Sequence, residues 1–335
     1  MHPVPRHTAL ATLVLTVLVT TPLARADEPL DPTEGSIERV GQISGFTSDS
    51  AGHHSVNNYW IHGEDGVVVI DAHWRLSDAE RALTALRAET DAPVRALLLT
   101  HPHTDHFGGA SVFLDAAKDV AYFSTPWGTR SIRNDEQGFV ANRQDQFGED
   151  FPAEVPVPRP VIESGVPLEI SGITLEPVVL RQNEAVETVV LYLAEERALF
   201  TGDLVNAATM PVFYQGGLDS WLEQLDELQR RFPSVETIYP GHGEPGDFDE
   251  LLGAQIALLE AHRDLVATAL DGDGRVDDDE RTRIADAIEQ RFPDAKTTAG
   301  VPARRKVIDL NIDWILRGWR VTETGAGDAQ EFRQQ

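Results

Sequence analysis

Residues 96–109 read ALLLTHPHTDHFGG, an apolar run that leads directly into a histidine-rich loop. Three histidines and one aspartate fall within the six residues from His101 to His106. Imidazole is a common zinc ligand, and a carboxylate can join it. His101 and His103 are two residues apart, so in an extended loop they point the same way, while Asp105 and His106 turn toward a neighbouring position. We therefore predict that this loop supplies ligands to two adjacent metal ions.

The stretch from His101 to His106 resembles the HxHxDH signature of the metallo-β-lactamase superfamily. The resemblance extends over roughly residues 45 to 250 and includes two later motifs at the ends of expected strands, TGD at 201–203 and PGHG at 240–243. In that family the aspartate of the first motif bridges both metals, and the histidine of the second binds the second metal. The resemblance therefore implies that Asp203 and His242 complete the site.

One position departs from the common family pattern. Many members carry a histidine in a Gly-His-Thr or Gly-His-Ser segment, whereas residues 182–188 read QNEAVET and no histidine lies between His106 and His242. A Glu-Ala-x-x-Glu segment here resembles the alkylsulfatase branch of the family, in which a glutamate binds zinc, and carboxylate is an accepted zinc ligand. We expect Glu184 to replace the histidine; a ligand role for Glu187, or a water in this place, is the alternative.

The resemblance implies a centre of two zinc ions, with iron or manganese as alternative metals. One ion would be held by His101, His103 and Glu184, the other by Asp105, His106 and His242, with Asp203 between them. Two close divalent ions lower the pKa of a bridging water, so hydroxide forms near neutral pH and attacks the substrate. Asp105 is also the expected catalytic residue, which steers this nucleophile or accepts a proton.

Four further side chains are candidates for supporting roles. Asp71 follows the β-branched run 67–70, where the family places an aspartate that holds a ligand histidine and fixes its tautomer; a plain turn residue is the alternative. Trp74, Phe213 and Tyr214 lie close in sequence to the expected ligand loops. We interpret these aromatic residues as candidate walls of a pocket for an apolar substrate portion, with ordinary packing as the alternative.

Strand-like and helix-like segments alternate along most of the chain. The expected strands are 67–70, 96–100, 120–123, 174–180, 188–193, 198–201 and 237–239. The expected helices are 78–89 with Ser77 as N-cap, a short one from about 108, and 134–146, 220–231, 249–270, 278–291 and 302–317. Two β-rich halves with helices outside predict an α/β protein with a four-layer αββα sandwich. We place this domain at 27–250, with 27 to about 50 as a loose polar arm that leads into an edge strand. We expect residues 251–335 to form a C-terminal helical extension packed on the core.

The N-terminus has the features of a secretory signal peptide over residues 1–26. Arg6 precedes an apolar run from 9 to 19, and Ala24-Arg25-Ala26 matches a small-x-small cleavage site. The segment predicts a periplasmic or secreted protein; an uncleaved anchor or a buried helix is the alternative.

Composition excludes several classes of partner and of chemistry. The 335 residues carry a formal net charge of −27, which repels nucleic acid phosphates and anionic membranes. There is no cysteine, so a thiolate cannot serve as metal ligand or nucleophile. We expect a small-molecule substrate, no nucleic acid partner and no stable membrane insertion after cleavage of the signal.

The predicted function is an exported di-zinc hydrolase of an ester, a lactone or a related acyl substrate. A β-lactam or sulfate-ester hydrolase on the same site, a non-catalytic metal-binding protein, and redox chemistry at two irons are the alternatives.

Residues 271–280 imitate a calcium-binding EF-hand loop. Asp271, Asp273 and Glu280 fit ligand positions, but the first ligand position falls on Ala269. Because losing that ligand weakens calcium binding, an acidic helix–turn–helix linker is our preferred interpretation.

Overall fold

The computed structural model describes residues 35–49, 55–136, 138–213, 215, 217–273, 275–297 and 304–324. The expected signal peptide and Tyr214 lie outside these residues. Among the helices of this part of the chain, none combines the length and the apolar character that crossing a membrane requires.

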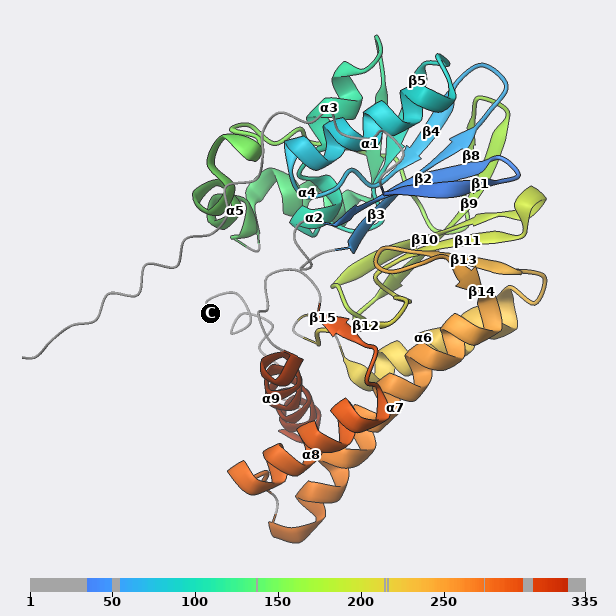
Figure 1. Cartoon of the computed structure of the whole chain (residues 1–335). Coiled ribbons are helices and arrows are strands. Elements are labelled where there is room, and N and C mark those ends of the chain that lie inside the picture. The colour runs from blue at the N-terminus through green and yellow to red at the C-terminus, as the bar shows by residue number, and fades with distance from the viewer. Residues whose placement is uncertain are drawn as a thin grey trace, which may run out of the picture. The chain divides into compact units, whose positions relative to one another are not determined.

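The first half of the chain forms a seven-stranded sheet in the order β1-β2-β3-β4-β5-β6-β7 (Figure 1). Its strands are β1 (Ser36–Val40), β2 (Ile43–Asp49), β3 (Ser55–His62), β4 (Val67–Ile70), β5 (Val94–Leu98), β6 (Ala121–Ser124) and β7 (Arg159–Pro160). Neighbouring strands from β1 to β4 pair antiparallel, and neighbouring strands from β4 to β7 pair in parallel. Parallel neighbours need crossover connections, and these are the helices α1 (Leu76–Glu89), α2 (Thr104–Phe107), α3 (Ala110–Asp115), α4 (Pro126–Asn134) and α5 (Phe139–Phe147), with the 3₁₀ turn η1 (Gly148–Asp150).

The second half forms a six-stranded sheet in the order β14-β13-β11-β10-β9-β8. Its strands are β8 (Leu168–Ile170), β9 (Ile173–Arg181), β10 (Glu187–Leu193), β11 (Ala198–Gly202), β13 (Thr237–Pro240) and β14 (Gly246–Asp247), and the 3₁₀ turn η2 (Ala194–Glu196) joins β10 to β11. Helix α6 (Leu218–Arg231) is the crossover between the parallel strands β11 and β13.

Three long helices follow the second sheet: α7 (Phe248–Asp273), α8 (Asp278–Arg291) and α9 (Arg304–Thr324). Before α9, the short strand β15 (Lys296–Thr297) pairs in parallel with β12 (Thr209–Met210). The C-terminal helical part therefore adds a strand beside the segment that follows β11.

The alternation of apolar residues along central strands explains the layering. In β4, Val67 and Val69 join the apolar cluster that contains α1 and α3, whereas Val68 and Ile70 join the cluster between the two sheets. Successive strand residues point to opposite faces, so a strand that is apolar at every position is buried on both. Both faces of the first sheet are thus covered.

The second sheet is buried on both faces in the same way. In β10, Val189 and Leu191 face the first sheet, and Val190 joins a cluster with residues from α6, α7, α8 and α9. The result is helices, sheet, sheet and helices, which confirms the predicted four-layer sandwich with a C-terminal helical part (Figure 1).

Several local predictions were wrong. The expected loose arm contains β1 and β2, which pair as a hairpin. Helix α1 begins at Leu76 with Arg75 as N-cap, and the Ser77 hydroxyl instead donates to the Asp150 carboxylate at 2.8 Å. The single helix expected over 134–146 is divided between α4 and α5, since Asp135 adopts a left-handed conformation with φ 44° that ends α4.

The acidic segment 271–280 connects two helices. Asp271 and Asp273 belong to the last turn of α7, and Asp277 is the N-cap of α8. Glu280 completes a capping box, because its carboxylate accepts from the Asp277 N–H at 2.9 Å. These assignments agree with the helix–turn–helix interpretation.

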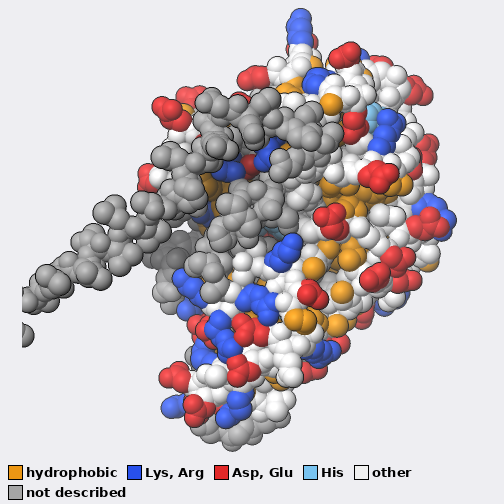
Figure 2. All heavy atoms as spheres, in the orientation of Figure 1, with side chains coloured by type: hydrophobic (Ala, Val, Ile, Leu, Met, Phe, Trp, Pro, Cys, Tyr) orange, Lys and Arg blue, Asp and Glu red, His pale blue; other side chains and the backbone are white. Residues whose placement is uncertain are grey.

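The surface carries both signs of charge. On the face drawn in Figure 2, acidic and basic side chains are interspersed. The sequence has 55 acidic residues against 28 lysines and arginines, so the excess is acidic.

Candidate metal centre

Loops at strand ends bring the candidate ligands together across the two sheets. The histidine loop follows β5, the turn with Glu184 precedes β10, Asp203 follows β11, and His242 follows β13. The backbone joins these loops directly, since Val189 N–H donates to Thr100 C=O at 2.7 Å. A second bond, from Gly241 N–H to Gly202 C=O at 2.9 Å, joins the loops after β11 and β13. The site therefore forms only when both sheets are in place.

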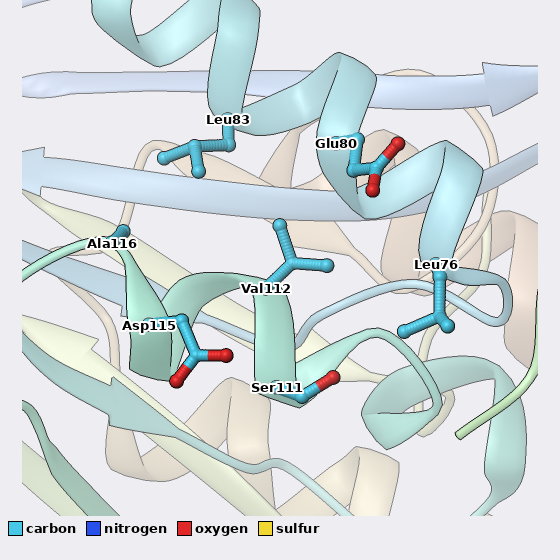
Figure 3. Close-up of a pocket in the computed structure, with 7 residues that line it drawn as sticks. All are labelled: Leu76, Glu80, Leu83, Ser111, Val112, Asp115 and Ala116. Atoms are coloured by element: carbon cyan, nitrogen blue, oxygen red, sulfur yellow. The ribbon is translucent and has the colours of Figure 1, made fainter. Parts of the chain in front are cut away.

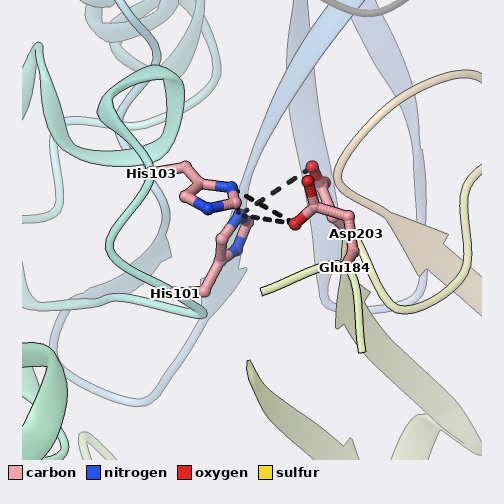
Figure 4. A group of neighbouring side chains, drawn as sticks. All are labelled: His101, His103, Glu184 and Asp203. Atoms are coloured by element: carbon pink, nitrogen blue, oxygen red, sulfur yellow. Dashed lines mark hydrogen bonds and ion pairs between the residues drawn. The ribbon is translucent and has the colours of Figure 1, made fainter. Parts of the chain in front are cut away.

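One group of buried side chains consists of His101, His103, Glu184 and Asp203, whose ligand atoms lie within 4.8 Å of one another (Figure 4). The His103 Nδ1 atom lies 3.0 Å from His101 Nε2 and 3.2 Å from Glu184 Oε2. The Asp203 Oδ2 atom lies 3.8 Å from His101 Nε2. In Figure 4 the two imidazoles and the two carboxylates face each other across one small space.

A second group consists of Asp105, His106 and His242, with ligand atoms within the same 4.8 Å. Asp105 Oδ2 lies 3.5 Å from His242 Nε2 and 3.8 Å from His106 Nε2. Asp203 also faces this group, because its Oδ1 is 3.4 Å from His106 Nε2 and its Oδ2 is 3.2 Å from His242 Nε2. The Asp203 carboxylate thus stands between the two groups.

The chemistry of these side chains fits metal ions. Among the described residues, His106 Nε2, Glu184 Oε2 and Asp203 Oδ1 are buried polar atoms that form no hydrogen bond, although each lies within 3.4 Å of an atom of another candidate ligand. Such atoms are costly unless something compensates them. All three belong to the two groups, and imidazole nitrogens and carboxylate oxygens are the donors that zinc accepts. The residues present therefore fit two metal ions.

Neighbouring charges decide the protonation of these buried groups. Burial lowers the pKa of His242, but the Asp203 and Asp105 carboxylates outweigh burial and raise it to about 10. Burial also lowers the pKa of His103, and the Glu184 carboxylate raises it to about 8. For Asp203 burial raises the pKa, yet His242 holds it well below its usual range. Protons on the histidines and metal ions therefore compete for the same buried negative charge.

Asp71 fixes the orientation of His106. Its carboxylate accepts from the backbone N–H of Thr100 at 2.8 Å and from the Thr100 hydroxyl at 2.7 Å. The same carboxylate lies 2.9 Å from His106 Nδ1. A proton on Nδ1 is thereby favoured, which leaves the Nε2 lone pair directed at Asp203 and Asp105.

Asn206 joins the two loops that carry Asp203 and His242. Its Oδ1 accepts from the His242 N–H at 3.1 Å, and its Nδ2 donates to the Asp203 C=O at 3.4 Å. Its own N–H donates to Gln255 Oε1 of α7 at 3.2 Å. Asn206 has no motif around it in the sequence, because nothing distinguishes a polar loop residue of this kind before its partners are known.

The backbone at Gly241 lies so close to the side chains of Asp203 and His106 that only glycine fits there. A Cβ there would lie 2.2 Å from Asp203 Oδ1 and 2.9 Å from His106 Cε1. Any side chain would displace the carboxylate that both groups share, which explains the glycine before His242.

Glu187, the alternative to Glu184, has other partners. Its carboxylate accepts from the Thr125 hydroxyl and, at 2.9 Å, from Arg181 Nε. It belongs to neither group of candidate ligands, whereas Glu184 belongs to the first.

The two aromatic pocket candidates that the structure describes, Trp74 and Phe213, are buried. Trp74 is 2% exposed, its ring centroid lies 5.1 Å from that of Phe147, and Arg143 Cζ lies 4.6 Å from it. Phe213 contacts Trp221 and His262 in the apolar cluster beneath the second sheet. These contacts match the packing alternative.

Two residues beside the centre were not anticipated. The ring centroid of Phe139 in α5 lies 6.0 Å from that of His103, and Gln215 Oε1 lies 3.0 Å from His103 Nε2. Phe139 falls within the helix expected over 134–146, but no sequence pattern indicates that it or Gln215 lies beside the histidine loop.

A surface pocket of about 430 Å³ lies elsewhere, between α1 and α3 (Figure 3). Its lining includes Leu76, Leu83 and Val112 with the carboxylates of Glu80 and Asp115, and none of the candidate ligands. Figure 3 shows these side chains on the two neighbouring helices, so the pocket belongs to the outer helical layer.

The family profile described as "Metallo-beta-lactamase superfamily" matches residues 51–242, which contain all seven candidate ligands. The chain belongs to the metallo-β-lactamase superfamily. It is accordingly a metal-dependent hydrolase, with two groups of residues able to hold metal ions.

Sequence relatives within the superfamily carry different activities in their names. "Metallo-beta-lactamase IND-1" of Chryseobacterium indologenes is 23% identical over 194 residues, which are 57% of this chain and 73% of that protein. "Linear primary-alkylsulfatase" of Pseudomonas sp. (strain ATCC 19151) is 21% identical over 218 residues, covering 55% of this chain and 41% of that protein. The named relatives of this metallo-β-lactamase superfamily member thus include a β-lactamase and an alkylsulfatase.

Solved structures show the same fold. A metallo-β-lactamase from Pontibacter korlensis matches with a TM-score of 0.53 and 22% identity, covering 67% of this chain and 98% of that one. The sec-alkylsulfatase Pisa1 from Pseudomonas sp. matches with a TM-score of 0.56 and 18% identity, covering 84% of this chain and 50% of that one. The match to Pisa1 covers 84% of this chain, which is more than the part that precedes α7. The likeness to Pisa1 therefore extends into the C-terminal helical part.

Proposed function

We propose that this protein is an exported di-zinc hydrolase that cleaves an ester, a lactone or a related acyl substrate. The observation that carries the proposal is the convergence of seven buried side chains in two groups that share the carboxylate of Asp203. In this proposal His101, His103 and Glu184 hold one ion, and Asp105, His106 and His242 hold the other.

Two zinc ions bound there would lower the pKa of a water molecule and polarise the reacting oxygen of the substrate. The protein's own residues arrange the reaction. Asp71 orients the ring of His106, and Asp203 supplies negative charge to both groups. Asp105, whose side chain is 12% exposed, is the candidate to hold the proton released from the attacking water at its carboxylate.

Purified protein tests this proposal directly. Elemental analysis is expected to give two zinc ions per chain, and removing them with a chelator is expected to abolish hydrolysis until zinc is restored. A panel of acyl esters, lactones, β-lactams and alkyl sulfates then identifies the bond that is cleaved. Zinc-loaded protein that hydrolyses none of them would contradict the proposal and favour a metal-binding role.

Sulfate-ester hydrolysis is the second candidate function. Two observations favour it: Glu184 stands in the candidate ligand group, and the likeness to Pisa1 extends into the C-terminal helices. Release of inorganic sulfate from an alkyl sulfate, without release of carboxylate from esters or lactones, would select it over the acyl substrates.

Export is tested separately by locating the mature protein. Expression of the full chain in a Gram-negative host should yield periplasmic protein whose N-terminus lies near Asp27. Full-length protein retained in the cytoplasm would contradict export.

A further inference from the structure

The side chain of Gln215 contacts two separate arms of the candidate metal centre. Its Oε1 atom lies 3.0 Å from Nε2 of His103, on the histidine loop. The same oxygen accepts from the backbone N–H of Val186 at 3.3 Å, two residues beyond Glu184. One carboxamide oxygen therefore joins the loop that carries His103 to the turn that carries Glu184.

The contact with the Val186 N–H determines which ring nitrogen of His103 carries the proton. An amide N–H can only donate, so the Gln215 atom that faces Val186 must be the carboxamide oxygen. An oxygen also facing His103 Nε2 requires a proton on that nitrogen. In neutral imidazole the proton is then absent from Nδ1, and Nδ1 is the nitrogen that lies 3.2 Å from Glu184 Oε2.

The C-terminal helical part holds the segment that carries Gln215. Asn311 of α9 is fully buried, its Nδ2 donates to Pro211 C=O at 2.8 Å, and its Oδ1 accepts from Phe213 N–H at 3.2 Å. Both contacts lie within four residues of Gln215. A helix far along the chain thus restrains the approach of Gln215 to His103.

We propose that Gln215 is a positioning residue of the metal centre, which presents Nδ1 of His103 to the ion and sets the spacing of His103 and Glu184. This inference rests on the two-metal centre of the proposed function and adds a residue that acts through a ligand.

Zinc affinity and ring tautomer test the inference without any substrate. Gln215→Met removes the acceptor and keeps the length of the side chain, Gln215→Glu keeps an acceptor oxygen, and Gln229→Met is a matched control at an exposed position on α6. Chelator competition is expected to show that Gln215→Met weakens one of the two zinc ions by about 10- to 100-fold. Gln215→Glu and Gln229→Met should bind both ions no more weakly than the unchanged protein.

The ¹⁵N chemical shifts of the His103 ring give a second readout. In unchanged, zinc-loaded protein they are expected to show a protonated Nε2 and a metal-bound Nδ1. A proton on Nδ1 overturns the inference even where Gln215→Met fails to fold, and so does full affinity for both ions in Gln215→Met. Zinc binding with no hydrolysis of any substrate overturns the proposed function alone, while weakened binding in Gln215→Met still supports the positioning role.

Discussion

The carboxylate of Asp71 lies 2.9 Å from Nδ1 of His106, although 35 positions separate the two residues. Asp71 also accepts two hydrogen bonds from Thr100, directly before the histidine loop. One buried carboxylate therefore fixes both the start of the loop and the tautomer of a candidate ligand. Its removal should affect metal binding as well as stability.

Asp71→Asn tests this relationship. An asparagine offers one oxygen where the carboxylate satisfies three donors, so at least one buried donor loses its partner. We expect zinc affinity at the group containing His106 to fall by about 10- to 100-fold. The free energy of unfolding of the metal-free protein should fall by about 1–3 kcal/mol. Chelator competition and urea denaturation measure the two effects, with Asp65→Asn as a control whose side chain is 66% exposed. Unchanged zinc affinity would refute the role assigned to Asp71.

Glu184→Gln and Glu187→Gln distinguish the two glutamates. We expect Glu184→Gln to reduce bound zinc from two equivalents toward one, because a neutral amide replaces a candidate ligand carboxylate. Glu187→Gln should keep both ions and lose stability, since its carboxylate is bound to Thr125 and Arg181. Elemental analysis after dialysis against a weak chelator measures the difference. The reverse pattern would transfer the ligand role to Glu187.

His262 should make the stability of the protein depend on pH. Burial lowers its pKa from 6.5 to about 4, so the ring is neutral in the folded protein at pH 7. Between these values the unfolded chain binds more protons than the folded one, and stability therefore falls as the pH drops through this window. The contribution amounts to at most about 3 kcal/mol.

His262→Leu removes this titration. Urea denaturation of metal-free protein at several pH values between 7 and 4 should give a shallower loss of stability for the variant. Parallel curves for the two proteins would exclude His262 as a cause.

Asn311→Leu tests the link between α9 and the segment after β12. A leucine of similar size leaves the Pro211 C=O and the Phe213 N–H without their partner, and each unsatisfied group costs about 1–3 kcal/mol. We expect a loss of stability in urea together with weaker zinc binding. Asn142→Leu, at an exposed position of α5, is the control. Loss of stability with unchanged zinc affinity would confine Asn311 to a structural role.

The central strands could be predicted from the sequence because most of their residues are buried and therefore apolar. The run Val67–Ile70 was expected as a strand and is β4, because four apolar β-branched residues in succession suit a strand that is covered on both faces. By contrast, β1 has one partly buried residue among five, so its polar sequence predicts a loose arm rather than a strand. An edge strand with little burial carries no alternation that a sequence pattern can reveal.

The sequence by itself determined the order of the layers and six of the seven candidate ligands, because both depend on local patterns: apolar runs that form strands, and motif side chains directly after them. Only the tertiary structure decided that Glu184 lies in the ligand group while Glu187 binds Thr125 and Arg181. It also decided that Gln215 contacts His103 and that Asn311 contacts the segment before Gln215. These choices depend on hydrogen bonds between segments that meet only after the sheets have packed. The sequence around a single polar side chain does not show which partner that side chain will bind.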